Sequence, residues 1–147
     1  MDPMNILGIE TSCDETSAAV VTDGIHLRSN VVASQDEIHS PYGGIVPEIA
    51  SRCHIERIQS ITETALLKAN MSLDDIDGVA VTAGPGLMGS LLVGLSYAKA
   101  LSYARKMPFK GINHLEGHIH AIFLEKKIEY PFIALLVSGG HTALYDV

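Results

Sequence analysis

The sequence predicts an α/β fold in which short apolar strands alternate with amphipathic helices. Two apolar runs near the N-terminus flank a polar loop, residues 47–69 carry apolar side chains every three or four positions, and residues 79–83 form a short apolar run before a glycine. With 147 residues, of which 47% are hydrophobic, the chain is long enough to bury one compact core.

The first predicted element is a β-hairpin, in which residues 6–9 and 18–21 form strands on either side of an unusually polar loop. Residues 27–34 extend this sheet as a third strand. A linker punctuated by proline and glycine follows at residues 35–44.

A long helix is predicted next, over residues 47–69. Pro47 suits the first turn of a helix, and Asn70 suits the position just after its last turn. Ser72 and Asp75 then predict a capping box for a short turn. The apolar stripe of the long helix consists of Ile55, Ile58, Thr62, Ala65 and Ala69.

A buried strand at residues 79–83 and a helix at residues 87–105 are joined by Gly84, Pro85 and Gly86. Backbone N–H groups at the start of a helix form a natural anion site. The same glycines also allow a strand and a helix to pack closely. The sequence leaves both interpretations open.

The rest of the chain predicts a strand at residues 109–113, a helix at residues 114–124 and a hairpin-like unit at residues 131–147. The last unit repeats the strand–turn–strand order of the N-terminal hairpin, so we expect residues 1–130 to form a first lobe and the remainder to begin a second. A hairpin without a sheet to pack on is marginal in water. We therefore expect Val147 to be an artificial or processed boundary.

The composition narrows the classes of function. A formal net charge of −7, from 17 acidic and 10 basic residues, repels nucleic acid, so this lobe alone should not bind RNA strongly. The apolar runs are far shorter than the roughly 20 residues of a membrane span, and the N-terminus does not resemble a secretory signal. Cys13 and Cys53 have no CxxC partner and are expected to be reduced thiols. A cytoplasmic protein without a membrane partner is the expectation.

His114 and His118 are four positions apart in a predicted helix, which places both imidazoles on one face. Such a pair suits one metal ion, although zinc and iron sites usually need a third protein ligand, which would come from outside this segment. A hydrogen-bonded or solvent-facing pair is the alternative. The position just after a strand favours a ligand site, because open α/β sheets bind ligands at the carboxyl ends of their strands.

The segment also invites a metalloprotease interpretation, because it resembles the HExxH signature. Glu116, however, is about 200° around the helix from both His114 and His118, so it should not reach a water on a metal held by them. His120 is expected to point away from His118 for the same reason.

Two turns are further candidates for binding. The turn from Ser138 to Thr142 contains two glycines, whose N–H groups could approach a phosphate, although such a turn is also common without any ligand. The first loop carries hydroxyl groups with Asp14 and Glu15, which could orient a substrate amine or a magnesium-bound phosphate, or could be ordinary turn residues.

Taken together, five motifs in order along nearly the whole chain resemble the TsaD (Gcp) family in its bacterial branch. They are IETSCDET (9–16), YGGIVPE (42–48), AGPGL (83–87), NHLEGH (113–118) and SGGHT (138–142). The resemblance implies an actin-like, sugar-kinase-like ATPase fold of two ribonuclease-H-like lobes, with the active site between them and only the first lobe present here.

The resemblance also implies an activity. Such enzymes transfer a threonylcarbamoyl group from threonylcarbamoyl-AMP to the exocyclic amine of the adenosine beside the anticodon in certain tRNAs. An older name for the family is O-sialoglycoprotein endopeptidase, which the position of Glu116 disfavours. An actin-fold kinase and a non-catalytic, partner-binding paralogue are competing classes, and the histidine pair separates both from the transferase.

Carried onto this sequence, the resemblance makes His114 and His118 ligands of one Fe²⁺ or Zn²⁺ ion, with an aspartate of the absent second lobe as third ligand. Asp14 and Glu15 become catalytic candidates in the first loop. The start of the site for threonylcarbamoyl-AMP or ATP would be Leu136, Val137, Ser138, Gly139 and Gly140.

The implied partners are tRNA, bound through the complete enzyme, a paralogous actin-fold protein that docks on the helices of this lobe, and a small ATPase. Because the second lobe is absent, we expect weak metal binding and no transfer by this chain alone.

Overall fold

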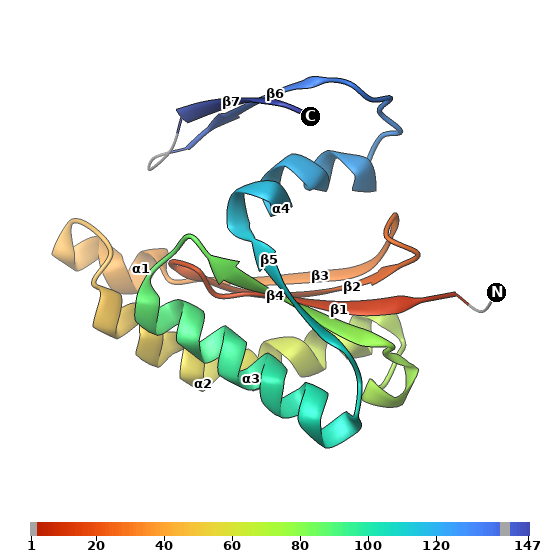
Figure 1. Cartoon of the computed structure of the whole chain (residues 1–147). Helices are drawn as coiled ribbons and strands as arrows, with labels where there is room; N and C mark the ends of the chain where they lie inside the picture. The colour runs from red at the N-terminus through yellow and green to blue at the C-terminus, as the bar shows by residue number, and fades with distance from the viewer. Residues whose placement is uncertain (1–2, 139–141) are drawn as a thin grey trace.

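A five-stranded mixed sheet forms the centre of the computed structural model, which describes residues 3–138 and 142–147 (Figure 1). Its strand order is β3-β2-β1-β4-β5. The first three strands form an antiparallel meander, whereas β4 pairs parallel with β1 and β5 pairs parallel with β4. These strands are β1 (Asn5–Glu10), β2 (Glu15–Thr22), β3 (His26–Ser34), β4 (Gly78–Gly84) and β5 (Phe109–Asn113).

Two long helices, α2 (Pro47–Ala69) and α3 (Met88–Arg105), cover one face of this sheet (Figure 1). The shorter α4 (His114–His120) lies on the opposite face. Within the described residues, no helix combines the length and the hydropathy that crossing a bilayer requires. The remaining short helical turns are α1 (Asp36–His39), η1 (Ser40–Tyr42), η2 (Leu73–Asp75) and η3 (Ala121–Leu124).

The core lies between the sheet and the two long helices. Leu7 and Ile9 of β1 are buried there, and the intervening Gly8 and the following Glu10 face the opposite side, because successive side chains of a strand alternate. Other core residues from β2, β4 and the long helices include Val20, Val79, Val81, Ala65 and Ala98. This alternation leaves one face of the sheet free to line a cleft.

The structure confirms most of the expected elements. The long helix spans the predicted residues and ends at Asn70, whose φ of 56° lies in the left-handed region. The capping box of Ser72 and Asp75 is present. Three expectations differ: Ile55 is 64% exposed instead of belonging to the buried stripe, the linker contains two short helical turns, and the helix predicted to reach residue 124 ends at His120 and continues as a 3-10 turn.

The break after β4 serves close packing against the β1–β2 loop. A Cβ atom at Gly86 would lie 2.6 Å from the carbonyl oxygen of Ser12, and the N–H of Leu87 donates to that same oxygen at 2.7 Å. The glycine is therefore required by the loop that passes over it. These contacts show tight packing against the β1–β2 loop, and the two interpretations left open by the sequence, an anion site and close strand-to-helix packing, stay predictions.

A second, two-stranded sheet ends the described chain. Its strands β6 (Ile133–Val137) and β7 (Thr142–Asp146) are antiparallel, as expected for a hairpin-like unit, and lie beyond α4 from the main sheet (Figure 1). The division into residues 1–130 and 131–147 stays a prediction.

Candidate metal site at the carboxyl ends of the parallel strands

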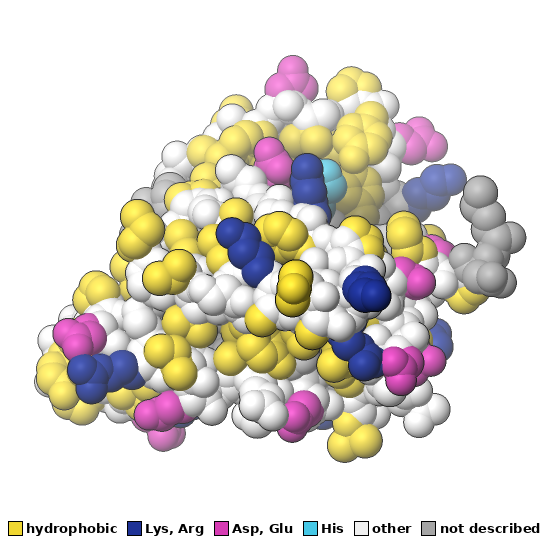
Figure 2. Space-filling view, turned by 60° about the horizontal axis from the view of Figure 1, so that its bottom comes forward, with side chains coloured by type: hydrophobic (Ala, Val, Ile, Leu, Met, Phe, Trp, Pro, Cys, Tyr) yellow, Lys and Arg dark blue, Asp and Glu magenta, His cyan; other side chains and the backbone are white. Residues whose placement is uncertain are grey.

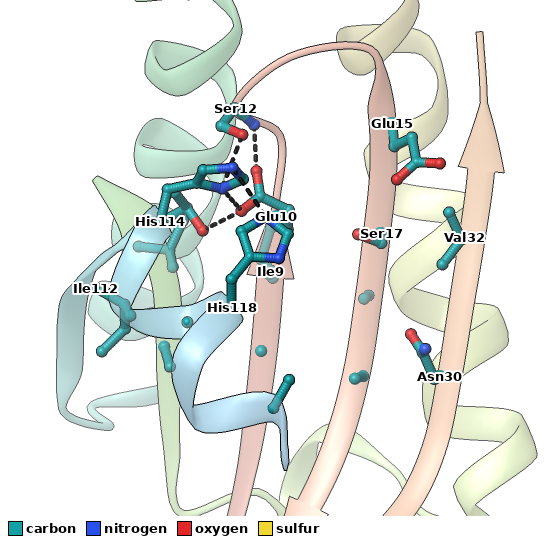
Figure 3. Close-up of a pocket in the computed structure, with 18 of the residues that line it drawn as sticks. Ile9, Glu10, Ser12, Glu15, Ser17, Asn30, Val32, Ile112, His114 and His118 are labelled. Carbon is teal, nitrogen blue, oxygen red and sulfur yellow. Dashed lines mark hydrogen bonds and ion pairs between the residues drawn. The ribbon is translucent and has the colours of Figure 1, made fainter. Parts of the chain in front are cut away.

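The carboxyl ends of the parallel strands β1, β4 and β5 meet at one edge of the main sheet. Glu10 ends β1, Thr82 lies near the end of β4, and His114 directly follows β5. These residues line a cleft of about 700 Å³ that extends over the uncovered face of β1 and β2 (Figure 3). Three segments far apart in the sequence thus contribute side chains to one site.

The two histidines of α4 face one another. Their Nε2 atoms are 3.1 Å apart, and the ring centroids are 4.6 Å apart with an interplanar angle of 87°. The helix begins where the side chain of Asn113 accepts hydrogen bonds from the N–H groups of Leu115 and Glu116. The expected arrangement on one helical face is confirmed; the role in metal binding stays a prediction.

A carboxylate lies behind the pair. Oε2 of Glu10 is 3.0 Å from Nδ1 of His114, on the side of the ring away from His118 (Figure 3). The hydroxyl of Thr82 donates to the same carboxylate oxygen at 2.5 Å, and the N–H of Ser12 donates to the other. The hydroxyl oxygen of Ser12 is 3.2 Å from Nδ1 of His114. Glu10 is thus held in place by the β1–β2 loop and by β4.

These contacts determine the charge of Glu10. Burial by itself raises the pKa of Glu10, but the hydrogen bonds from Ser12, Thr82 and His114 together outweigh burial and lower the pKa below its ordinary value. The side chain is therefore a carboxylate at neutral pH, and it can only accept hydrogen bonds.

The facing nitrogens fit two positions in a metal shell. Zinc–imidazole bonds are about 2.0–2.1 Å long, so two nitrogens 3.1 Å apart can both reach one ion. Metal-binding histidines usually donate their second N–H to a carboxylate or carbonyl, as His114 can donate to Glu10. Within residues 3–138 and 142–147, no group of three or more histidine, cysteine, aspartate or glutamate side chains is gathered as a metal site.

The neighbouring polar residues of α4 lie away from this pair, as expected. His120 donates through Nδ1 to the carbonyl oxygen of Glu116 at 2.8 Å. The side chain of Glu116 is exposed and is absent from the described lining of the cleft. The carboxylate next to the histidines is Glu10, which does not have the position of the glutamate in HExxH.

Asp14 and Glu15 both line the cleft, at the end of the β1–β2 loop and the start of β2. Asp14 is half-buried, and Glu15 is exposed. The backbone carbonyl of Asp14 accepts a hydrogen bond from the N–H of Gln35 at 3.0 Å, which fixes the loop. Their catalytic role stays a prediction.

Of the residues predicted to begin a nucleotide site, Leu136 lies at a second hollow. Leu136 and His118 both line a pocket of about 240 Å³ between α4 and β6. Val137 and Ser138 are exposed. Gly139 and Gly140 lie outside the described residues.

Sequence reasoning missed Glu10, Ser12 and Thr82 as members of the site. Glu10 and His114 are separated by 104 positions and come together only because β4 pairs with both β1 and β5. The signal in the sequence is local only: Glu10 is the last residue of β1, and His114 directly follows β5.

Residues 26–147 match the profile of the TsaD family, described as tRNA N6-adenosine threonylcarbamoyltransferase. Proteins with that name from Syntrophus aciditrophicus and Geotalea uraniireducens are 66% and 62% identical to this chain over 98% of its length. The chain spans only 43% and 42% of the length of these two relatives.

Among solved structures, the chain is similar to YeaZ from Pseudomonas aeruginosa, with a TM-score of 0.62. The match covers 98% of this chain and 65% of that one. At 16% identity the likeness concerns the fold alone, and it confirms the predicted α/β architecture of an actin-like lobe.

Proposed function

The chain belongs to the TsaD family of tRNA N6-adenosine threonylcarbamoyltransferases, and on this premise we propose that it supplies the first lobe and the histidine pair of such an enzyme. The complete enzyme would transfer the threonylcarbamoyl group of threonylcarbamoyl-AMP to the N6 amine of the adenosine beside the anticodon of tRNA. The observation that carries the proposal is the 3.1 Å separation of the facing Nε2 atoms of His114 and His118.

His114 and His118 would hold one Fe²⁺ or Zn²⁺ ion, and an aspartate beyond this chain would complete its ligands. When bound, the ion would supply positive charge that polarises phosphate or carbamoyl oxygens. The chain's own contribution is to fix both imidazoles at the edge of the cleft, through the Asn113 cap and the contact with Glu10. A fixed arrangement of this kind avoids reorganisation during the reaction.

The cleft is large enough for a nucleotide ligand such as threonylcarbamoyl-AMP or ATP, because small-molecule sites commonly enclose about 300–1,000 Å³. Asp14 and Glu15 line it and would orient the attacking amine. Leu136, which lines the neighbouring pocket together with His118, and the residues that follow it up to Gly140 would contact the adenylate. The net charge of −7 opposes contact with tRNA phosphates, so we assign the grip on tRNA to other parts of the complete enzyme.

We assign the outer faces of α2 and α3 to a paralogous actin-fold partner, with a small ATPase as a further component. Figure 2 shows hydrophobic side chains spread over the helical side of the molecule among basic and acidic ones. Apolar residues that the two helices leave exposed include Ile55, Leu67, Met88, Leu92 and Tyr103. Aromatic and aliphatic side chains of this kind are typical anchors of a protein interface.

The test uses a chimera in which this chain replaces the matching 145 residues of the Syntrophus aciditrophicus relative. The chimera, with partner proteins, ATP, threonine and bicarbonate, is expected to modify tRNA, whereas the 147-residue chain alone is expected to be inactive. Changing His114 or His118 to alanine should remove both the bound metal and the modification. Measurement of metal content and of modified adenosine reports both effects.

His120→Ala is the matched control, because His120 lies on the same helix but is bonded to the backbone of Glu116. It should keep the metal and the activity. Full transfer by the variant that lacks both His114 and His118 would contradict the proposal and favour the kinase or the partner-binding class.

A further inference from the structure

Glu10 forms a hydrogen bond with Nδ1 of His114, the ring nitrogen that points away from His118. Glu10 comes from the end of β1, so its position does not depend on α4. Its carboxylate accepts hydrogen bonds from the N–H of Ser12 and from the hydroxyl of Thr82. Ser12 belongs to the β1–β2 loop and Thr82 to β4, so neither donor depends on α4. The carboxylate is therefore a fixed acceptor against which the imidazole must align.

A fixed acceptor selects one tautomer of His114. Nδ1 of His114 is 3.0 Å from Oε2 of Glu10. Since the carboxylate can only accept, the proton of the neutral imidazole belongs on Nδ1. Nε2 of His114 then carries a lone pair, which faces Nε2 of His118 at 3.1 Å. In the metal-free chain, His118 completes this contact by donating its own Nε2–H.

We propose that Glu10 is a positioning residue that holds His114 with its proton on Nδ1, so that the Nε2 lone pair is presented to the ion shared with His118. The proposal rests on the metal site described above as part of the function. It adds a carboxylate–histidine–metal relay that starts in the first strand of the fold. Removing such a partner commonly weakens metal binding about 10- to 100-fold.

Glu10→Gln reverses the direction of the hydrogen bond with Nδ1 of His114 without changing the size of the side chain. The N–H of Ser12 still needs an acceptor, which the amide oxygen of the new glutamine provides. The amide NH₂ group then occupies the position of Oε2, where it donates to Nδ1 of His114 and the hydroxyl of Thr82 turns to accept from it. The ring proton moves to Nε2, where it blocks the lone pair that the metal requires.

The first measurement is the tautomer of His114 in the purified, ¹⁵N-labelled chain, read from the ¹⁵N shifts of its two ring nitrogens and assigned with a His114→Gln sample. The wild type is expected to carry the proton on Nδ1, and Glu10→Gln to carry it on Nε2. Ser12→Ala removes the other neighbour of Nδ1 and should leave the tautomer as it is. A wild-type proton on Nε2 overturns the proposal without the use of any variant.

The second measurement is the affinity for Zn²⁺, by competition with a chromophoric chelator, for the chimera and its variants. Glu10→Gln should bind Zn²⁺ about 10- to 100-fold more weakly than the parent. Glu37→Gln, an exposed glutamate of α1, should bind like the parent. Equal affinity of the parent and Glu10→Gln overturns the proposal.

Failure of the proposed function gives a different result. A parent chimera that binds no Zn²⁺ but shows the proton of His114 on Nδ1 contradicts the metal site and supports the control of the tautomer by Glu10. If the parent chimera binds Zn²⁺ but Glu10→Gln leaves the tautomer of His114 unchanged, the metal site is supported and the control of the tautomer by Glu10 is contradicted.

Discussion

Nε2 of His54 donates a hydrogen bond to the carbonyl oxygen of Cys13 across 3.0 Å, and this contact joins helix α2 to the β1–β2 loop. Nδ1 of the same ring lies 2.8 Å from the hydroxyl of Thr16, which can donate to it. The ring is fully buried, and both nitrogens have partners that suit the neutral form. Burial lowers the pKa of His54, and the opposing effects of the Cys13 carbonyl and of the charges on Glu10 and Asp14 do not restore it.

Acid should therefore weaken the fold through His54. Below about pH 6.5, the ordinary value for histidine, the unfolded chain binds a proton that the folded ring excludes. The contribution of His54 to the free energy of unfolding is fully present above that pH and is lost as the pH falls below it. Urea denaturation between pH 5 and pH 8 measures the slope.

Replacement of His54 by glutamine should lower stability at pH 8, because the bonds to Cys13 and Thr16 are lost or weakened, and should flatten the dependence on pH below 6.5. His26, which is exposed on the edge strand β3, provides the control: His26→Gln should keep the wild-type slope. Equal slopes for wild type and His54→Gln would show that the ring titrates alike in both states.

Gly94→Ala should destabilise the chain by about 1–3 kcal/mol, as overpacking of a core commonly does. A Cβ atom at this position of α3 would collide with Oγ1 of Thr11, which is buried and donates to the carbonyl of Ser90 at 2.8 Å. Gly117→Ala in α4 is the matched change, because no described atom beyond its chain neighbours and the backbone of its own helix lies within 4 Å of the new Cβ. It should stabilise the helix by up to about 1 kcal/mol. Thermal or urea unfolding distinguishes the two; equal effects would contradict this account.

Asn113→Ala should cost about 1 kcal/mol of stability, since it removes the acceptor for two N–H groups at the start of α4. Fraying of that first turn should also loosen His114 and weaken the binding of Zn²⁺ by the chimera. Asn113→Asp keeps an acceptor oxygen and should restore both properties. A variant that lost stability but kept its full affinity would show that the cap does not position the ring.

The β6–β7 hairpin should cause self-association of the isolated chain. Leu135 and Leu144 are paired across the two strands and are 66% and 68% exposed, beside the exposed Ile133 and Val137. Contiguous apolar surface of this kind promotes association. Sedimentation should show fewer oligomers for Leu135→Lys with Leu144→Lys, whereas Ile25→Lys, at an exposed position just before β3, should behave like the wild type. Unchanged oligomers in the hairpin variant would place the contact elsewhere.

The local elements were predictable because their signals are short-range. The spacing of Ile58, Thr62 and Ala65 defines the buried side of α2, and Asn70 ends the helix as a left-handed residue. Ile55 shows the limit of such spacing: it continues the periodic pattern, yet it is exposed, whereas the neighbouring Cys53 and His54 take the buried side of that turn.

The histidine pair was predictable for the same reason, since His114 and His118 are one helical turn apart. Glu10 was not, because nothing in the local sequence states that β4 will be inserted between β1 and β5. The contacts of Glu10 with Thr82 and His114 exist only once that order is established. Long-range strand order, rather than residue type, carried the missing information.

Among the described strands, β5 is the last on its side of the main sheet and pairs with β4 alone. Edge strands open more readily than central ones, and each opening of β5 separates His114 from Glu10. A ligand held by His114 and by the rest of the chain would slow that opening. The exchange rate of the amide hydrogens of β5, measured by hydrogen–deuterium exchange, should therefore fall when a ligand occupies the cleft, and it reports occupancy without any assay of catalysis.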